Sequence, residues 1–292
     1  MGEIVGVGLI SHAPTVMLPR EVRYELNEGK EISLVPGLRR LRSEVLDALN
    51  PDTIVILDTH WHTTVEHVFA SHERRSGKYT SEELPRGISQ LPYDYRGDPD
   101  LAEAAAEEVT GNGVKGTPIS DPYLPVHYGT INLVHYLCRS ERVVSVSMVQ
   151  TGETEDFLHL GEALGRAVAT LDRRVVVLAS GGMTHRFWPL RQLVDHEASD
   201  PVHIFTPEAR AADEERLGWM AAGDHARIIR TMPDYLPHEP EAGFGHYLAM
   251  VAAVGGERCT APGRQFSDYE NATGTGQVHV WFDRPSRGWT AT

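Results

Sequence analysis

The stretch that decides the fold is residues 52–62, Asp-Thr-Ile-Val-Ile-Leu-Asp-Thr-His-Trp-His. Residues 53–57 form an apolar run rich in β-branched side chains, which predicts a strand buried on both faces of a parallel sheet. The sequence then turns polar at once. Open α/β sheets place their chemistry at the carboxyl ends of such strands. We therefore expect functional side chains among residues 58–62.

The same pattern occurs twice more in the chain. Residues 4–10 are apolar and are followed by Ser-His-Ala-Pro, which contains His12. Residues 175–179 are apolar and are followed by Ser-Gly-Gly-Met-Thr-His, which contains His185. Three predicted strands thus each deliver a histidine just past their ends. These histidines, His12, His60 and His185, converge if the strands are neighbours in the sheet.

The remaining periodicity predicts one α/β domain over residues 1–292. Amphipathic helices are expected over 36–49 and 154–171, a strand over 143–149 and another helix over 242–254. A strand followed by a helix and a second strand implies a parallel pair with a right-handed crossover. We expect a central, mostly parallel sheet with helices on both faces. Residues 14–36 and 233–240 are expected to be irregular.

Residues 71–100 form a long polar connection in which no regular structure is predicted. Such a connection is more often a functional cover than a plain linker. Its tyrosines and leucines favour packing over disorder. We therefore predict that it covers the active site.

Composition excludes several classes of protein. A net charge of −14 argues against a nucleic-acid-binding protein, which would carry a basic face. The two cysteines, Cys138 and Cys259, show no metal-binding spacing. The apolar run at 4–10 is too short to span a membrane, and it lacks the basic start and small-residue cleavage site of a signal peptide. We expect a cytoplasmic enzyme that acts on a small molecule and has no membrane partner.

Two histidines and one carboxylate on one face of a metal ion form the ligand set of non-haem Fe(II) oxygenases. His12 and His60 can supply the nitrogens, with His62 as the alternative to His60. Glu239 and Glu241 are the candidate carboxylates. Glu241 is the one expected at the start of the 242–254 helix, whose positive end would favour its ionised form.

Six motifs in order give the chain a resemblance to the class III extradiol ring-cleaving catechol dioxygenases. Within that superfamily it is most similar to the homoprotocatechuate (3,4-dihydroxyphenylacetate) 2,3-dioxygenase group. The motifs are Ser11-His12-Ala13-Pro14, the 52–61 stretch, Tyr79 to Pro85, Tyr128-Gly129-Thr130, Leu178 to Phe187, and Gly274 to Val278.

The resemblance implies a role for each candidate residue. His12, His60 and Glu241 match the metal ligands, for Fe(II) or, less commonly, Mn(II). His185 matches the acid–base histidine beside the metal. His127 falls where many members carry a second histidine near the substrate, although the homoprotocatechuate enzymes carry an acidic residue there. His246, on the predicted 242–254 helix, is a further candidate for substrate contact.

The implied reaction is the opening of a catechol ring by O₂ beside its two hydroxyl groups, by a homo-oligomeric enzyme. The catechol must lose protons, and histidine is the side chain whose pKa suits that task near neutral pH. Alternatives are a different catechol or an aminophenol as substrate, a zinc hydrolase using the same ligands, and a non-enzymatic relative of this fold.

Overall fold

The computed structural model describes residues 1–85, 87–111 and 113–290. Its main sheet has the strand order β4-β5-β7-β2-β8-β1-β12-β9, with β3 paired to β7 and β6 paired to β3. A separate hairpin pairs β10 with β11. The strands are β1 (Glu3–Ile10), β2 (Thr53–Thr63), β3 (His67–Ala70), β4 (Arg74–Tyr79), β5 (Leu91–Gly97), β6 (Gly116–Ile119), β7 (Arg142–Val149), β8 (Arg174–Ser180), β9 (Gly263–Gln265), β10 (Glu270–Ala272), β11 (Thr275–Gln277) and β12 (His279–Asp283).

The three strands that carry the histidine motifs are neighbours, which meets the condition under which their histidines can converge. β8 lies between β2 and β1 and is parallel to both. Ile10, Ser180 and Asp58 share one register position, so the three carboxyl ends are level. The chain segments that follow these residues therefore start from one edge of the sheet.

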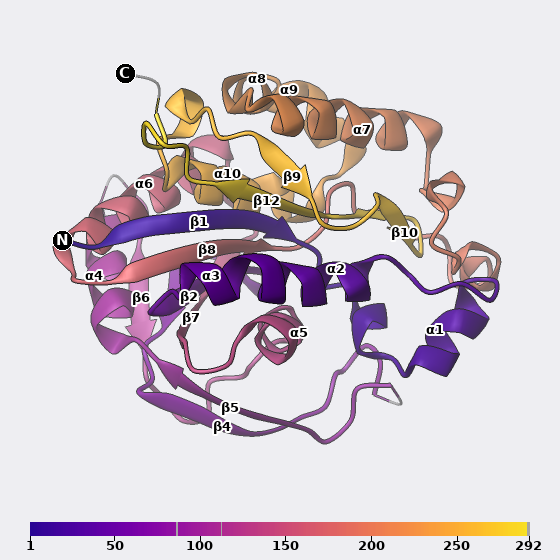
Figure 1. Ribbon diagram of the computed structural model, residues 1–292, viewed down its shortest axis with the longest axis horizontal. Helices are drawn as coiled ribbons and strands as arrows, with labels where there is room; N and C mark the ends of the chain where they lie inside the picture. Colours follow the sequence, from indigo (N-terminus) through magenta and orange to yellow (C-terminus); the bar gives the residue numbers. More distant parts are fainter. Residues whose placement is uncertain (86, 112, 291–292) are drawn as a thin grey trace.

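Helices cover both faces of the sheet, as predicted (Figure 1). Val55 and Leu57 of β2 pack with α4, α6 and α10, whereas Ile54 and Ile56 pack with α2 and α5 on the other face. This alternation follows from the two-residue period of a strand. The helices are α1 (Arg20–Leu26), α2 (Leu34–Leu41), α3 (Asp47–Leu49), α4 (Pro99–Val109), α5 (Tyr128–Leu137), α6 (Thr154–Thr170), α7 (Pro207–Ala222), α8 (His225–Arg230), α9 (Met232–Tyr235) and α10 (Gly245–Ala252), and a π-helical turn at Arg42–Leu46 joins α2 to α3.

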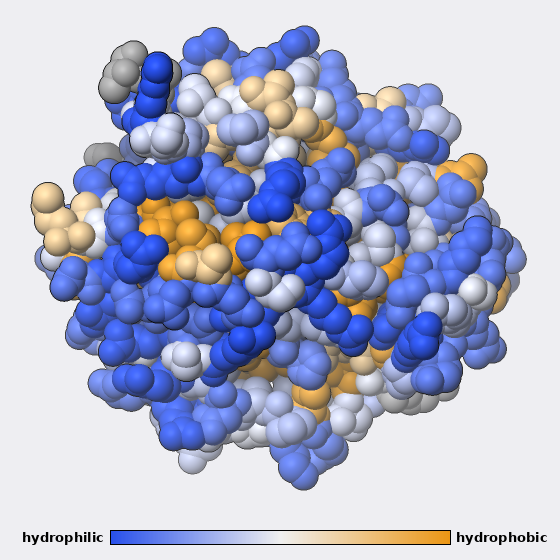
Figure 2. All heavy atoms as spheres, viewed as in Figure 1, coloured by the Kyte–Doolittle hydropathy of each residue, from blue (hydrophilic) through white to orange (hydrophobic). Residues whose placement is uncertain are grey.

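The surface in the view of Figure 2 is mostly hydrophilic, in keeping with the net charge of −14. Hydrophobic side chains gather in patches, the largest of which in this view lies over β1. No helix within the described ranges is long and apolar enough to cross a membrane.

Two segments expected to be irregular contain regular structure. Residues 14–36 include a 3-10 turn (Pro14–Met17), α1 and the start of α2. Residues 233–240 include most of α9 and a 3-10 turn at Leu236–His238. Prolines caused both errors, since Pro14, Pro233 and Pro237 stand in first turns, where proline fits a helix.

The 71–100 connection is also more regular than expected, because β4 and β5 form an antiparallel hairpin at the edge of the sheet. Arg86 in this connection lies outside the described residues. Glycine, proline and charged side chains are typical of edge strands and hide their alternation. Whether the connection covers the site stays a prediction, although Glu83 and Leu84 line the main cavity described below.

Candidate active site

His12 follows β1 and is fixed by the neighbouring strand and by α5. The Ser180 hydroxyl donates to the carbonyl of Gly129 at 2.8 Å and lies 2.9 Å from Nδ1 of His12. Because the hydroxyl has only one hydrogen, it accepts from Nδ1, and this assigns the proton of His12 to Nδ1. In the neutral ring the lone pair is then on Nε2, which lies 3.4 Å from Oε1 of Glu241. This is the arrangement expected of a metal-binding histidine.

His60 lies within β2, and not past its end as the sequence suggested. The pairing of β2 with β7 jumps from Asp58 to His62, so the residues between them bulge out of the ladder. Asp58 holds the bulge by accepting the backbone N–H of His60 at 2.9 Å. The His60 ring lies against Tyr128, with ring centres 3.8 Å apart. Its Nε2 is 3.1 Å from Glu83, and its Nδ1 is buried without a hydrogen-bond partner in the described structure.

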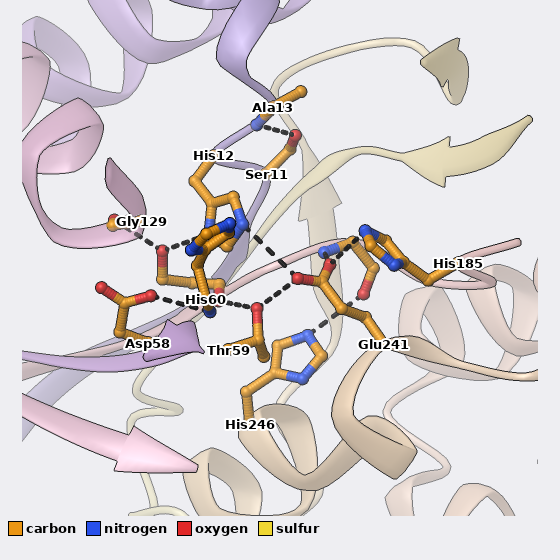
Figure 3. Close-up of polar contacts among 12 residues, drawn as sticks. Ser11, His12, Ala13, Asp58, Thr59, His60, Gly129, His185, Glu241 and His246 are labelled. Carbon is orange, nitrogen blue, oxygen red and sulfur yellow. Dashed lines mark hydrogen bonds and ion pairs between the residues drawn. The ribbon is translucent and has the colours of Figure 1, made fainter. Parts of the chain in front are cut away.

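Glu241 points into the site, while Glu239 points away from it. Glu241 is 6% exposed, and its carboxylate accepts hydrogen bonds from the Gly182 N–H and the Thr59 hydroxyl (Figure 3). The Glu239 side chain is 59% exposed and pairs with Arg186 at 3.5 Å. The geometry therefore favours Glu241 as the carboxylate of the site.

The expected helix does not begin at Glu241. A 3-10 turn at Glu241–Phe244 separates it from α10, and Ala242, Gly243 and Phe244 all have positive φ. The hydrogen bonds from Gly182 and Thr59 thus stabilise the ionised form of Glu241, a role that was predicted for the N-terminus of a helix. Their donors were not among the predicted site residues, although Thr59 lies directly before His60 in the motif.

Charges inside the site reinforce the pairing of His12 with Glu241. Burial alone would raise the pKa of Glu241, but the His185 and His12 side chains hold that pKa well below its usual value. Burial acts to lower the pKa of His12, but the Glu241 carboxylate raises it above its ordinary value. A cation bound beside these imidazole nitrogens would stabilise the buried, ionised carboxylate.

His185 lies on the opposite side of Glu241 from His12 (Figure 3). Its Nε2 is 3.8 Å from Oε2 of Glu241, and the side chain is 28% exposed. The ring packs edge-on against Phe187, with ring centres 4.8 Å apart. His185 lines the main cavity together with His12 and Glu241. It therefore meets any molecule bound beside those two residues.

His127 lies near His60 and Trp61. The two ring centres are 6.3 Å apart, and His127 stacks on Trp61 at 5.8 Å. Burial lowers the pKa of His127, which favours its neutral form. Ligand atoms of His60, His127 and Glu82 all lie within 4.8 Å of one another, so His60 belongs to a possible metal-binding set other than the predicted one; the ligand atoms of His12, His60 and Glu241 are not gathered this closely in the described structure. The Glu82 side chain is 60% exposed, whereas Glu241 is buried.

The other two histidines occupy different surroundings. His246, on α10, is fully buried, and its Nε2 lies 3.1 Å from the carbonyl oxygen of Gly182. Burial lowers its pKa to about 4, so the ring is neutral near pH 7. Figure 3 places it beneath Glu241, and it is not among the residues that line the cavity. His62 is exposed, while His60 is half-buried; neither is among the residues that line the cavity.

Gly129 has no room for a side chain. A Cβ there would lie 2.1 Å from Oδ1 of Asp58 and 2.8 Å from Nδ1 of His12. The Tyr128-Gly129-Thr130 motif therefore lets α5 approach the ends of β1 and β2. Thr130 completes this contact by donating to Oδ2 of Asp58 at 2.7 Å.

The site opens into one large hollow, which we call the main cavity. It has about 1070 Å³ of empty space, including its open mouth. His12, Glu241 and His185 line one part of it, and residues of α1, β10 and the 197–199 segment line another. The cavity has room for an aromatic ring and its substituent.

The residues present fit a metal ion. His12 offers Nε2 in its neutral form, His60 offers Nδ1, which is buried without a hydrogen-bond partner and lies 4.0 Å from Oε1 of Glu82, and Glu241 offers an ionised carboxylate. The His12 and His60 rings are 6.4 Å apart, centre to centre, and perpendicular within 15°. Two imidazoles and one carboxylate suit Fe(II) and leave positions open for other ligands.

Comparisons with known proteins identify the class of this protein. A family model described as the catalytic LigB subunit of aromatic ring-opening dioxygenase matches residues 6–283. The chain belongs to this family, and the protein is a ring-cleaving dioxygenase, an oxidoreductase. This assignment leaves no support for the zinc hydrolase and non-enzymatic alternatives.

Individual relatives agree with the family. The chain is 28% identical over 258 residues to the 3,4-dihydroxyphenylacetate 2,3-dioxygenase of Escherichia coli, covering 87% of this chain and 91% of that protein. It is 24% identical over 295 residues to the 2-aminophenol 1,6-dioxygenase beta subunit of a Pseudomonas species, covering 96% and 93%. An uncharacterized Escherichia coli K12 protein of known crystal structure shares the fold, with a TM-score of 0.64 and 16% identity over 95% of this chain and 99% of that one.

Proposed function

We propose that the protein opens the ring of a substituted catechol beside its two hydroxyl groups, using Fe(II) and O₂. The observation that carries the proposal is the convergence of His12, Glu241 and His185 on one cavity at the carboxyl ends of β1 and β8. 3,4-Dihydroxyphenylacetate belongs to the proposed substrate class, since it is the substrate named for a relative.

We assign the metal to His12, His60 and Glu241. When bound there, Fe(II) would supply the redox chemistry that lets O₂ react with the ring. The protein supplies orientation: Ser180 fixes the tautomer of His12, and Thr59 and Gly182 fix the carboxylate of Glu241.

His185 is the proposed acid–base residue. It lines the cavity beside Glu241 and is partly exposed, so its Nε2 can accept a proton from a catechol hydroxyl. The same nitrogen can return that proton later in the reaction. His127 is proposed as a neutral hydrogen-bonding group at the substrate, near His60. His246 is fully buried, so we propose that it supports Glu241 by its contact with Gly182 and does not touch the substrate.

Metal content of purified variants tests the ligand assignment. His12→Ala and Glu241→Gln should lose Fe(II) and oxygen uptake with a catechol. Glu239→Gln, which changes a charge only two residues away, should keep both. His127→Ala should keep its iron, although its turnover should fall. Loss of iron from His127→Ala with retention in His12→Ala would instead place the metal among His60, His127 and Glu82.

We propose 2-aminophenols as the second candidate substrate class, because a relative is named for 2-aminophenol. Adjacent hydroxyl and amino groups can approach a metal as two hydroxyls do. Oxygen uptake measured with matched catechols and 2-aminophenols separates the two classes. A rate on the aminophenol that exceeds the rate on the catechol would reverse our order.

The 71–100 connection is proposed to cover the bound substrate, because Glu83 and Leu84 line the main cavity and Glu83 contacts His60. Limited proteolysis within this segment should slow when a catechol is bound without oxygen. Unchanged cleavage would show that the segment is a surface insertion. Homo-oligomeric assembly also stays a proposal, which sedimentation of the purified protein would test against the mixed assembly implied by the relative's "beta subunit" name.

A further inference from the structure

One part of the main cavity, which we call the far wall, is lined by residues of α1, β10 and the 197–199 segment. None of these segments has a role in the proposed reaction. β10 pairs with β11 so that Glu270 lies opposite Gln277, and Gln277 accepts a hydrogen bond from Ser11, the neighbour of His12. The side chain of Asn271 donates to the carbonyls of His196 and Ala198, at 2.8 Å each. These contacts fix the wall in relation to the metal ligands.

This wall carries two carboxyl groups. Glu270 is 6% exposed, with Oε1 accepting from the Ser33 N–H at 2.6 Å and Oε2 buried without a hydrogen-bond partner. Glu197 is half-buried and has no ion-pair partner among the described residues. Burial raises the pKa of both groups, which means that their negative charges are poorly compensated.

The permanent positive charge on the described lining of the cavity is already neutralised. Arg23 lies 6% exposed and makes two hydrogen bonds to the carboxylate of Glu31, at 2.7 and 2.8 Å. Its Nη1 also donates a hydrogen bond to the carbonyl of Leu18. A bidentate pair of this kind holds the guanidinium in place, so Arg23 is not free to bind a second carboxylate.

Apolar side chains line the space between the site and this wall. Leu18, Leu26, Ile32 and Phe187 all border the cavity. A short alkyl chain on the catechol ring would bury against them. A carboxylate at the end of that chain would meet Glu270 and Glu197, whereas a cationic or hydrogen-bond-donating group would find acceptors there.

We infer that the natural substrate is a catechol whose alkyl substituent ends in an amine, and not in a carboxylate. The inference rests on the proposed function and adds the charge of the substituent. It separates this protein from the relative named for 3,4-dihydroxyphenylacetate. Glu270 and Glu197 are the specificity-determining residues in this scheme, and they take no part in ring opening.

The test compares three catechols that carry a two-carbon substituent at the same ring position, at pH 7.5. They are 3,4-dihydroxyphenethylamine, 4-ethylcatechol and 3,4-dihydroxyphenylacetate. Oxygen uptake by the iron-loaded protein should give kcat/KM values that fall in that order, with about tenfold or more between the amine and the acid. Affinities measured without oxygen should follow the same order, so the dissociation constant should be smallest for the amine and largest for the acid.

Variants locate the source of the preference. Glu270→Gln should reduce the ratio of kcat/KM for the amine to kcat/KM for the acid at least about fivefold, chiefly through KM. Glu197→Gln should change this ratio in the same direction. Glu25→Gln removes a charge from the exposed side of α1 and should leave the ratio unchanged. Should Glu270→Gln fail to fold, Glu197→Gln still decides the question.

The outcomes separate the two proposals. Absence of ring opening with all three catechols would refute the proposed function. Ring opening with the acid preferred over the amine would leave the function standing and overturn the inference. An amine preference that neither Glu270→Gln nor Glu197→Gln alters would remove these carboxyls from substrate recognition and overturn it as well.

Discussion

Glu270→Gln should change how the stability of the metal-free protein depends on pH. Glu270 is 6% exposed, and burial raises its pKa from 4.5 to about 6. The folded state therefore holds this proton more tightly than the unfolded state. Its ionisation disfavours folding progressively as pH rises from about 4.5 through 6. Glutamine has no such proton, so the variant lacks this contribution.

The magnitude follows from the size of the shift. A rise from 4.5 to about 6 corresponds to about 2 kcal/mol, at about 1.4 kcal/mol per pKa unit. The difference in unfolding free energy between variant and parent should thus move in favour of the variant by about 2 kcal/mol between pH 4 and pH 8. Any constant effect of the new amide, which keeps an oxygen for the Ser33 N–H, cancels in this comparison.

Urea unfolding followed by tryptophan fluorescence measures this change. Unfolding curves for the parent, Glu270→Gln and the exposed control Glu25→Gln would be recorded at pH 4, 6 and 8 in the presence of a chelator. The control should track the parent at every pH. A difference between Glu270→Gln and the parent that stays constant from pH 4 to pH 8 would refute the reasoning, because Glu270 would then ionise as easily in the fold as outside it.

Three further substitutions test the active site. His185→Phe should retain iron and bind catechol without oxygen but lose turnover about 10²–10⁴-fold; loss of iron would make His185 a ligand. Ser180→Ala removes the acceptor for Nδ1 of His12 and should weaken metal binding about 10–100-fold in a competition titration with a chelator, where unchanged affinity would contradict the tautomer assignment. Gly129→Ala should destabilise the fold by about 1–3 kcal/mol in thermal or urea unfolding, because its Cβ would lie 2.1 Å from Asp58. Gly218→Ala on α7, with nothing within 4 Å, should not destabilise it.

The mostly parallel sheet could be predicted because it follows from local patterns. Each apolar run marks a strand buried on both faces, and the polar residue that follows marks its carboxyl end. That β1, β2 and β8 are neighbours was a condition left open by the sequence, and the strand order meets it. The resemblance supplied the choice of Glu241 over Glu239, which the opposite burial of the two side chains now supports.

Other features depend on contacts that no local pattern contains. The bulge that keeps His60 inside β2 arises from pairing with β7, and the polar sequence alone reads as a strand end. Ser180 acts through its contacts with His12 and Gly129, which are distant in sequence. The wall containing Glu270 is least accessible to prediction, since β10 and β11 are three residues each and reach the cavity only through tertiary packing.

The position of β1 in the sheet has a consequence for the order in which the protein is made. β1 leaves the ribosome before its two partners, β8 at residues 174–180 and β12 at residues 279–283. β1 therefore stays without both of its neighbouring strands until late in synthesis. An unpaired apolar strand is prone to aggregation and to chaperone binding in this period. Glu241 is synthesised after β8 and before β12, so it also reaches His12 late in synthesis. Under the proposed assignment of the metal to His12, His60 and Glu241, a chain that ends before Glu241 lacks one ligand, so metal binding would follow the synthesis of that residue.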